Sequence, residues 1–277
     1  GMLYNVWSSG PQGVGFSGSS TSLEPDRLCI FLRLAHVEKD KMLGLSPEEV
    51  KLVAMRSLRH ALNAVPPQIQ MELTVVHDVP PAMVDGLINR TQSTFNTVRL
   101  NQVRHIVPFD RGNRATNLLV FQLALEESEG VQYFVEEDYL HRAEAIVGLL
   151  QILQHNRTSF ATGFDHPDRY WKGTPFGKGD LEGGLSHVVA DPVKLSHHWR
   201  TVESTTMTFG CRAEVFVHIA AVFLELAPRD RAIWYEIWDI GYWLWTPIPC
   251  LVTHMHYQQC FYFNWDALAL SLLHEPG

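Results

Sequence analysis

Three consecutive acids follow a short apolar segment in the middle of the chain. Residues 131–135 (VQYFV) have the composition of a buried β-strand, and Glu136, Glu137 and Asp138 come directly after it. Open α/β folds bind ligands at the carboxyl ends of their strands, and carboxylate oxygens are ligands that Mg²⁺ and Mn²⁺ prefer. Alternate residues of an extended strand share a face, so we expect Glu136 and Asp138 to point together and Glu137 to point away. The competing interpretation is an acidic helix N-terminus.

Two histidines near the C-terminus are further candidate metal ligands. His254 and His256 lie two residues apart in a predicted strand, so they share one of its faces. A neutral imidazole beside a carboxylate is an ordinary site for Mn²⁺ or Zn²⁺. More than a hundred residues separate His254 from Asp138, so the sequence leaves open whether they meet. A histidine hydrogen-bonded in the core or at the surface is the alternative.

An alternation of predicted strands and helices must position these residues. Strands are predicted over residues 28–34, 71–78, 97–101 and 131–135, with helices opening at Ser46, after residues 80–81, at residue 112 and at residue 141. This order predicts an α/β fold with a mostly parallel central sheet, Rossmann-like, flanked by helices. After residue 156, Gly and Pro become dense among aromatic residues, which is typical of long functional loops. We expect a strand over residues 204–209, helices over 213–226 and 229–245, and a strand over 250–257.

Composition narrows the class of protein. The chain has 277 residues, 46% of them apolar, and a net charge of -8, which permits a large core and argues against a nucleic-acid-binding protein. Its longest apolar run, over residues 215–224, is interrupted by His218 and is too short for a membrane span. The four cysteines form no C-x-x-C pair. We therefore expect a cytoplasmic protein. Residues 8–22 are rich in Ser and Gly, so we expect residues 1–27 to form a flexible N-terminal arm.

Three segments resemble nucleotide-sugar glycosyltransferases of the GT-A fold, and in particular the small bacterial group around majastridin. They are the strand that ends in Asp78, the segment 134–138 (FVEED) where that family keeps an acidic D-x-D-type motif, and the segment 247–254 (PIPCLVTH). The likeness extends over most of the chain. It departs from the family at the acidic motif, which reads Glu136-Glu137-Asp138.

The resemblance implies metal-dependent transfer of a sugar from a nucleotide-sugar to a carbohydrate or polyol acceptor of unknown identity, with a UDP-sugar as the expected donor. Residues 28–156 would be the nucleotide-sugar-binding half, and residues 157–277 the acceptor-binding half and C-terminal extension of the same domain. Mn²⁺ or Mg²⁺ is the expected cofactor, because a divalent cation removes the repulsion between an acidic sheet edge and a pyrophosphate. Asp138 and His254 would hold it.

The same resemblance assigns further residues to the donor. The expected nucleotide-sugar contacts are Leu34, Ala35, His36, Asp78, Asn113, Arg114, Asn117, Glu136 and Glu137. Asp78 would contact the base or ribose, and its alternative is a turn cap before Pro80. Arg114 is a candidate for a charge-assisted contact to phosphate or a sugar hydroxyl, whereas ordinary residues at a helix start explain it equally well.

On the acceptor side, Asp165 and His166 lie in a segment that combines carboxylates, an imidazole and aromatic rings, and Gly184 would allow close approach of the backbone. An inverting transferase also needs a general base. Asp230 and Asp239 are the candidates, and because roughly two and a half helical turns separate them they point to opposite sides. Asp230 is favoured by its position at a helix start, although a retaining enzyme would need neither.

Two other functions remain compatible with the residues. One is a metal-dependent hydrolase of nucleotide diphosphates or phosphoesters that uses Asp138 and the histidines. The other is a non-catalytic protein that binds UDP on the same fold, which the replacement of the family's first aspartate by Glu136 favours.

Overall fold

The computed structural model describes residues 26–35, 42–109, 112–167, 187–189, 191, 193–255 and 263–276. The candidate residues His36, Gly184 and His256, like the predicted N-terminal arm up to residue 25, lie outside the described residues. No helix within these described ranges is long and apolar enough to cross a membrane.

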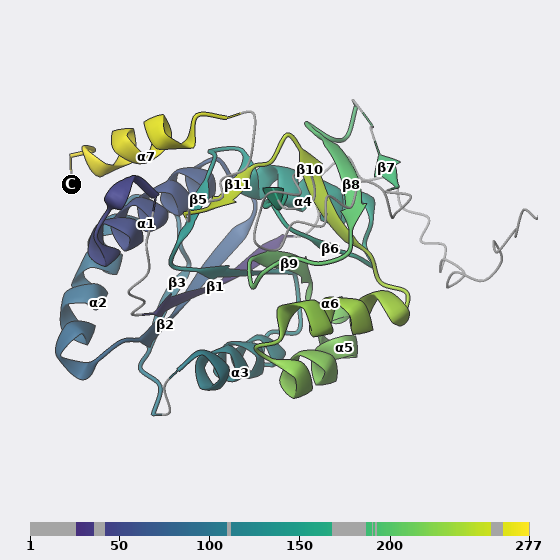
Figure 1. Ribbon diagram of the computed structural model, residues 1–277, viewed down its shortest axis with the longest axis horizontal. Coiled ribbons are helices and arrows are strands. Elements are labelled where there is room, and N and C mark those ends of the chain that lie inside the picture. The colour runs from purple at the N-terminus through teal and green to yellow at the C-terminus, as the bar shows by residue number, and fades with distance from the viewer. Residues whose placement is uncertain are drawn as a thin grey trace, which may run out of the picture.

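A nine-stranded sheet runs through the molecule in the order β3-β2-β1-β4-β9-β6-β10-β8-β7 (Figure 1). The strands are β1 (Arg27–Ala35), β2 (Gln70–Asp78), β3 (Gln102–Ile106), β4 (Val131–Glu136), β6 (Phe160–Ala161), β7 (Val188–Val189), β8 (His198–Val202), β9 (Phe209–Arg212) and β10 (Leu244–Ile248). Strands β1 to β4 are parallel, whereas β9 is antiparallel to both of its neighbours. The predicted α/β fold with a mostly parallel sheet flanked by helices is confirmed.

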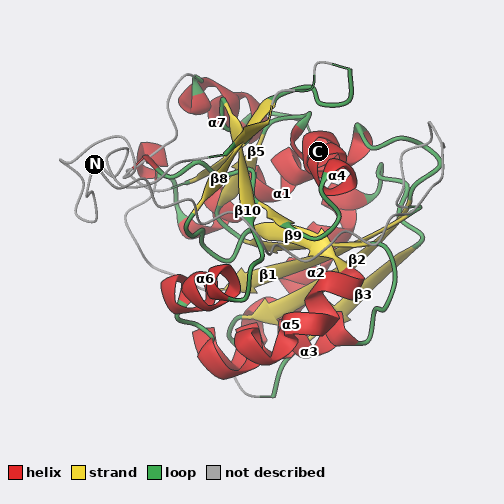
Figure 2. Ribbon diagram, turned by 90° about the vertical axis from the view of Figure 1, so that its right-hand side faces the viewer, coloured by secondary structure: helices red, strands yellow, loops and turns green. Residues whose placement is uncertain are grey.

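Helices cover both faces of this sheet (Figure 2). They are α1 (Pro47–Asn63), α2 (Pro81–Phe95), α3 (Asn113–Leu125), α4 (Ala145–His155), α5 (Ala213–Leu226), α6 (Asp230–Asp239) and α7 (Trp265–Leu273), with a short 3-10 helix at Met42–Gly44. Side chains of β1 alternate between the two cores, as the pleat of a strand requires. Ile30 and Leu32 pack in the core under α1, α4 and α7, and Cys29 and Phe31 pack against α3, α5 and α6.

Local signals located several elements accurately. The predicted start of α1 is confirmed, because Ser46 and Glu49 form a capping box and Pro47 occupies the first helical position. Helix α5 has the predicted bounds, and β1 and β2 lie within one or two residues of theirs.

Other predicted boundaries are wrong. Residues 97–101 are not a strand: β3 begins at Gln102 after a turn in which the Asn101 amide donates to the carbonyl of Met71. The predicted helix over residues 229–245 ends at Asp239, because Gly241 has a φ of 96° and the chain then enters β10. Residues 204–208 have no regular structure before β9.

A second, two-stranded sheet lies at the carboxyl edge of the parallel strands. Strand β5 (Tyr139–His141) follows the acid triplet directly and pairs antiparallel with β11 (Val252–His254). The helix predicted to open at residue 141 therefore begins only at Ala145, as α4. The pairing carries the C-terminal part of the chain back to the end of β4.

Candidate active site at the carboxyl edge of the sheet

The acid triplet is not a continuous strand. Glu136 is the last residue of β4, and Glu137 and Asp138 form the turn into β5. The expected alternation, with Glu136 and Asp138 on one face, is therefore wrong, and each acid has its own partner. Glu136 forms an ion pair with Arg33, Glu137 accepts a hydrogen bond from the Ala35 amide at 3.3 Å, and Asp138 contacts His254.

Asp138 and His254 meet across the small sheet. Asp138 Oδ2 lies 2.9 Å from His254 Nε2, although 116 positions separate the two residues in the chain. The contact follows from the register of β5 and β11, which sets His254 opposite Tyr139, and from the Met255 amide, which donates to the Asp138 carbonyl at 2.7 Å. The Asp138 residue is 7% exposed. The two candidate metal ligands thus lie together, as the metal hypothesis requires.

The imidazole of His254 is held by aromatic neighbours. The Tyr139 ring stacks on it with a centroid distance of 4.9 Å and an interplanar angle of 17°, and the edge of Phe164 lies against both rings. The Tyr139 hydroxyl forms a hydrogen bond with Thr206, in the segment that leads to β9. Because Tyr139 is fully buried, this stack fixes the plane of the imidazole.

Glu137 differs from its two neighbours. It is buried, and burial, reinforced by the adjacent Asp138 carboxylate, raises its pKa to about 8. In a large share of the molecules the Glu137 carboxyl group is therefore protonated at neutral pH. Glu137 accepts the Ala35 amide hydrogen bond and so holds the end of β1 in position. It also carries less negative charge than the sequence alone implied.

Arg33 joins the ends of three parallel strands. Its side chain extends from β1 and pairs with Glu136 of β4. The Arg33 Nη1 atom lies 3.2 Å from Thr116 Oγ1 of α3 and 4.0 Å from Asp78 Oδ2 of β2. Asp78 also accepts hydrogen bonds from the Gly112 amide and the Thr116 hydroxyl, both at 3.0 Å. Arg33 was not among the predicted site residues, and its signal was a single cation inside the otherwise apolar residues 28–34.

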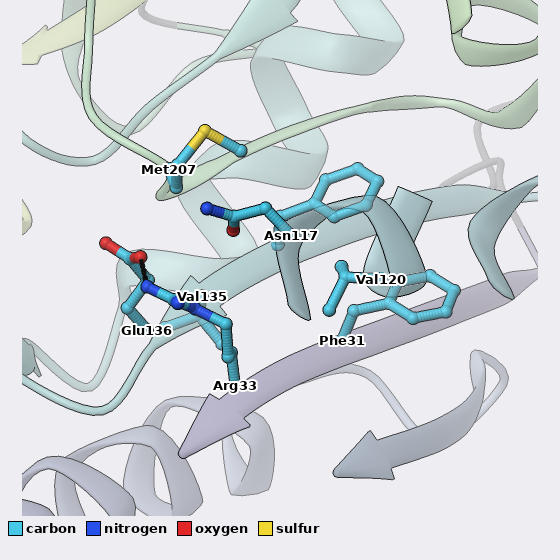
Figure 3. Close-up of a pocket in the computed structure, with 8 residues that line it drawn as sticks. Phe31, Arg33, Asn117, Val120, Val135, Glu136 and Met207 are labelled. Atoms are coloured by element: carbon cyan, nitrogen blue, oxygen red, sulfur yellow. Dashed lines mark hydrogen bonds and ion pairs between the residues drawn. The ribbon is translucent and has the colours of Figure 1, made fainter. Parts of the chain in front are cut away.

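A small pocket opens beside this network (Figure 3). It is lined by Phe31, Arg33, Asn117, Val120, Phe134, Val135, Glu136 and Met207. Asn117 is buried and donates from Nδ2 to Asn113 Oδ1 at 2.8 Å. Asn113 and Arg114 are exposed at the start of α3, and the candidate residues Leu34 and Ala35 are buried at the end of β1.

Asp230 and Asp239 occupy opposite ends of α6 and different environments. Asp230 begins the helix, and its Oδ1 is buried without a hydrogen-bond partner. Burial, with the Glu136 carboxylate nearby, raises its pKa to about 7, although Arg33 opposes the shift. Asp239 is exposed at the last turn. Asp230 therefore interacts electrostatically with Glu136 at the end of β4.

The two described acceptor candidates are Asp165 and His166. Asp165 is buried and forms an ion pair with Arg200 at 2.7 Å, so part of its role is structural. The His166 ring lies 4.1 Å from the Phe164 ring, measured between centroids. Through Phe164 this segment contacts the stack around His254.

Another cluster with metal-ligand chemistry lies at the opposite end of the sheet. Cys29, Glu72 and Glu127 place ligand atoms within 4.8 Å of one another. Both glutamates are already paired with Arg27, and Arg104 also binds Glu127. Burial raises the pKa of the Cys29 thiol to about 11, which disfavours the thiolate that a metal binds. The arginines explain this cluster as an ion-pair network.

Comparison with known proteins finds no family profile that matches the chain and no curated protein with a similar sequence. Solved structures do match. GalNAc-T7 with UDP, GalNAc and Mn²⁺ aligns with a TM-score of 0.54 at 12% identity, over 83% of this chain and 44% of that one. TarS of S. aureus aligns with a TM-score of 0.50 at 11% identity, over 79% of this chain and 35% of that one. The chain thus spans less than half the length of either protein, and it has the fold of GT-A glycosyltransferases.

Proposed function

We propose that the chain is a metal-dependent glycosyltransferase that takes a sugar from a UDP-sugar. The observation that carries this proposal is the contact between Asp138 and His254 at the carboxyl edge of the parallel strands, where α/β folds bind their ligands. The GT-A fold and a solved neighbour that contains UDP, GalNAc and Mn²⁺ support it. The narrower likeness to the majastridin group stays a prediction from the three sequence segments.

The residues present fit a divalent cation. A carboxylate oxygen and an imidazole nitrogen 2.9 Å apart are a donor pair that Mn²⁺ accepts, and cations that act on phosphates commonly keep only one or two protein ligands. The Glu137 carboxyl interacts electrostatically with Asp138, and the carboxyl groups of Glu136 and Asp230 interact with the neighbouring Tyr139. When bound, the cation would neutralise the diphosphate and stabilise its departure.

The residues around this pair would orient the donor. Arg33 holds Glu136 and lies close to Asp78, so it keeps the ends of β1, β2 and β4 in fixed positions. Leu34, Ala35 and Asp78 would border the nucleotide, together with His36. Asn113 and Arg114, exposed at the start of α3, would reach phosphate or sugar hydroxyls.

Asp230 is our candidate for the general base of an inverting reaction. A base works best when its pKa lies near the working pH, and the pKa of Asp230 is about 7. Its Oδ1 is buried and has no hydrogen-bond partner, so no donor competes for this carboxylate oxygen. Asp239 has no comparable environment and is left out of the proposed mechanism. Asp165, His166 and Gly184 would lie on the acceptor side.

Calorimetric titration with UDP, with and without Mn²⁺, tests the proposal. We expect binding that depends on Mn²⁺ and is lost in Asp138→Ala, because a ligand of the cation is removed. Asp85→Ala is the matched control, since Asp85 is an exposed acid of α2 and its removal should leave binding unchanged. The absence of UDP binding under both conditions would contradict the proposal.

Product analysis separates the proposal from its alternatives. Sugar transfer to an acceptor in a screen of carbohydrates and polyols supports a transferase. Release of UMP from the donor without any acceptor would instead indicate a hydrolase, and tight UDP binding with no turnover would indicate a binding protein.

A further inference from the structure

We infer that Tyr133 and His141 position the proposed metal ligands, because the hydrogen bond between them joins the two strands on either side of the acid turn. The acid turn is the segment that carries Glu136, Glu137 and Asp138. We call this hydrogen bond the Tyr–His clamp. The inference rests on the proposed function and adds two positioning residues to it that bind neither the metal nor the donor.

The Tyr–His clamp closes a short segment of chain. Tyr133 lies on β4 before the acid turn, and His141 lies on β5 after it, eight positions further along the chain. The Tyr133 hydroxyl oxygen is 2.7 Å from His141 Nε2, and each of the two residues is 1% exposed. Because the clamp joins both strands that flank Glu137 and Asp138, it limits how far the acid turn can shift relative to the large sheet.

The neighbours of His141 fix the direction of this hydrogen bond. His141 Nδ1 lies 3.1 Å from the carbonyl oxygen of Tyr139, which can only accept, so Nδ1 carries a ring proton. Burial lowers the pKa of His141 to about 4, so the ring is neutral at neutral pH and its Nε2 is an acceptor. The Tyr133 hydroxyl therefore donates to Nε2, and both ring nitrogens of His141 have a partner.

A further pair of hydrogen bonds ties this part of β5 to helix α1. The His141 amide donates to Ser57 Oγ at 3.0 Å, and the Ser57 hydroxyl donates in turn to the carbonyl of Ala54 at 2.7 Å. Ser57 is as deeply buried as His141. These contacts with β4 and α1 are additional to the pairing of β5 with β11, so His141 fastens the small sheet to the body of the molecule.

The position of β5 affects the metal pair directly. Asp138 comes immediately before β5, and Tyr139 is opposite His254 in the strand register and stacks on its imidazole. If β5 were freed from β4, the acid turn between them could shift, and the 2.9 Å separation of Asp138 Oδ2 and His254 Nε2 would change with it. Loss of residues that orient metal ligands typically costs about 10–100-fold in metal affinity.

Mn²⁺ titrations of three variants and a control test the inference. With UDP present and well below the melting temperature of each variant, Tyr133→Phe should bind Mn²⁺ about tenfold more weakly than the parent. A residue that only stabilises the fold would leave this affinity unchanged. His141→Asn should cause a similar loss, and the double variant should lose no more, because residues that act through one hydrogen bond have non-additive effects.

Tyr242→Phe is the matched control. It removes another Tyr–His hydrogen bond, which joins the Tyr242 hydroxyl to His218 Nδ1 of α5 at 2.5 Å, and it should leave the Mn²⁺ affinity unchanged. Full Mn²⁺ affinity in Tyr133→Phe, or a loss in the double variant of about a hundredfold, the product of the two single losses, overturns the inference while the proposed function stands.

Histidine side-chain nitrogen shifts, measured by NMR in the metal-free protein, test the clamp independently of metal binding. The parent should show His141 as the neutral tautomer with its proton on Nδ1, and the His254 resonances should move in Tyr133→Phe but not in Tyr242→Phe. A proton on Nε2 of His141, or His254 resonances that do not move in Tyr133→Phe, overturns the inference. If the parent binds no Mn²⁺ in the presence of UDP, the proposed function fails and the inference fails with it.

Discussion

Replacing Arg33 by Met should destabilise the protein strongly, because two acids would lose the cation beside them. Arg33 pairs with Glu136, lies 4.0 Å from Asp78, and its side chain is 9% exposed. Removing one member of a buried ion pair leaves an uncompensated charge and costs roughly 3–5 kcal/mol. For a chain of this size each kcal/mol corresponds to about 2–4 °C in melting temperature, so Arg33→Met should melt roughly 6–20 °C below the parent.

Urea denaturation at neutral pH measures this effect. The matched control is Arg90→Met, which removes an ion pair with Glu48 whose side chains are 36% and 38% exposed and should cost less than about 1 kcal/mol. In Arg33→Met/Glu136→Gln the Glu136 carboxylate is gone, and Asp78 keeps its hydrogen bonds from the Gly112 amide and the Thr116 hydroxyl. More than half of the lost stability should therefore return. A loss below about 1 kcal/mol in Arg33→Met, or no recovery in the double variant, would refute the reasoning.

Three further predictions concern pH and the metal ligands. His141 is buried between the Tyr133 hydroxyl and the Tyr139 carbonyl, and burial lowers its pKa from 6.5 to about 4. The stability that this neutral histidine contributes is therefore fully present above pH 6.5 and falls by roughly 3 kcal/mol as the pH drops toward 4. The melting temperature should depend less on pH over that range in His141→Gln than in the parent. An equally steep fall of the melting temperature with pH in that variant would contradict the assignment of this pH dependence to His141. If Asp230 is the base, kcat should rise with pH around a midpoint near 7. Asp230→Asn should lower kcat about 10²–10⁴-fold and remove this pH dependence. An unchanged dependence of kcat on pH in Asp230→Asn would exclude Asp230 as the base. Tyr139→Leu removes the ring that stacks on His254 and should weaken Mn²⁺-dependent UDP binding several-fold. Tyr139→Phe keeps the ring and should keep the affinity. An equal loss of affinity in both variants would exclude stacking as the cause of the weaker binding.

Sequence reasoning succeeded where the signals were local. The apolar run of β1 and the capping box at Ser46 each depend on neighbouring residues, and both predicted their elements closely. It failed at β10, where residues 243–245 (WLW) resemble the end of an apolar helix face. In β10 only Leu244 and Trp245 pair with β6, whereas Pro247 pairs with β8 alone. No local sequence pattern predicts this pairing.

The candidate site shows the same division. Asp138 was a prediction from three adjacent acids, whereas its partner His254 is brought to it by the pairing of β5 with β11. Arg33 escaped notice because its two acidic neighbours come from other strands. Long-range contacts of this kind depend on strand order and register, which a single sequence does not specify.

Pulsed electron paramagnetic resonance of bound Mn²⁺ tests the central claim most directly. With UDP present, we expect a nitrogen coupling from an imidazole that binds the ion, because His254 Nε2 lies 2.9 Å from the Asp138 carboxylate. The coupling should disappear in His254→Ala, and binding of the ion itself should be lost in Asp138→Ala. A bound Mn²⁺ with no nitrogen coupling, or a coupling that persists in His254→Ala, would contradict the proposal that Asp138 and His254 hold one metal ion.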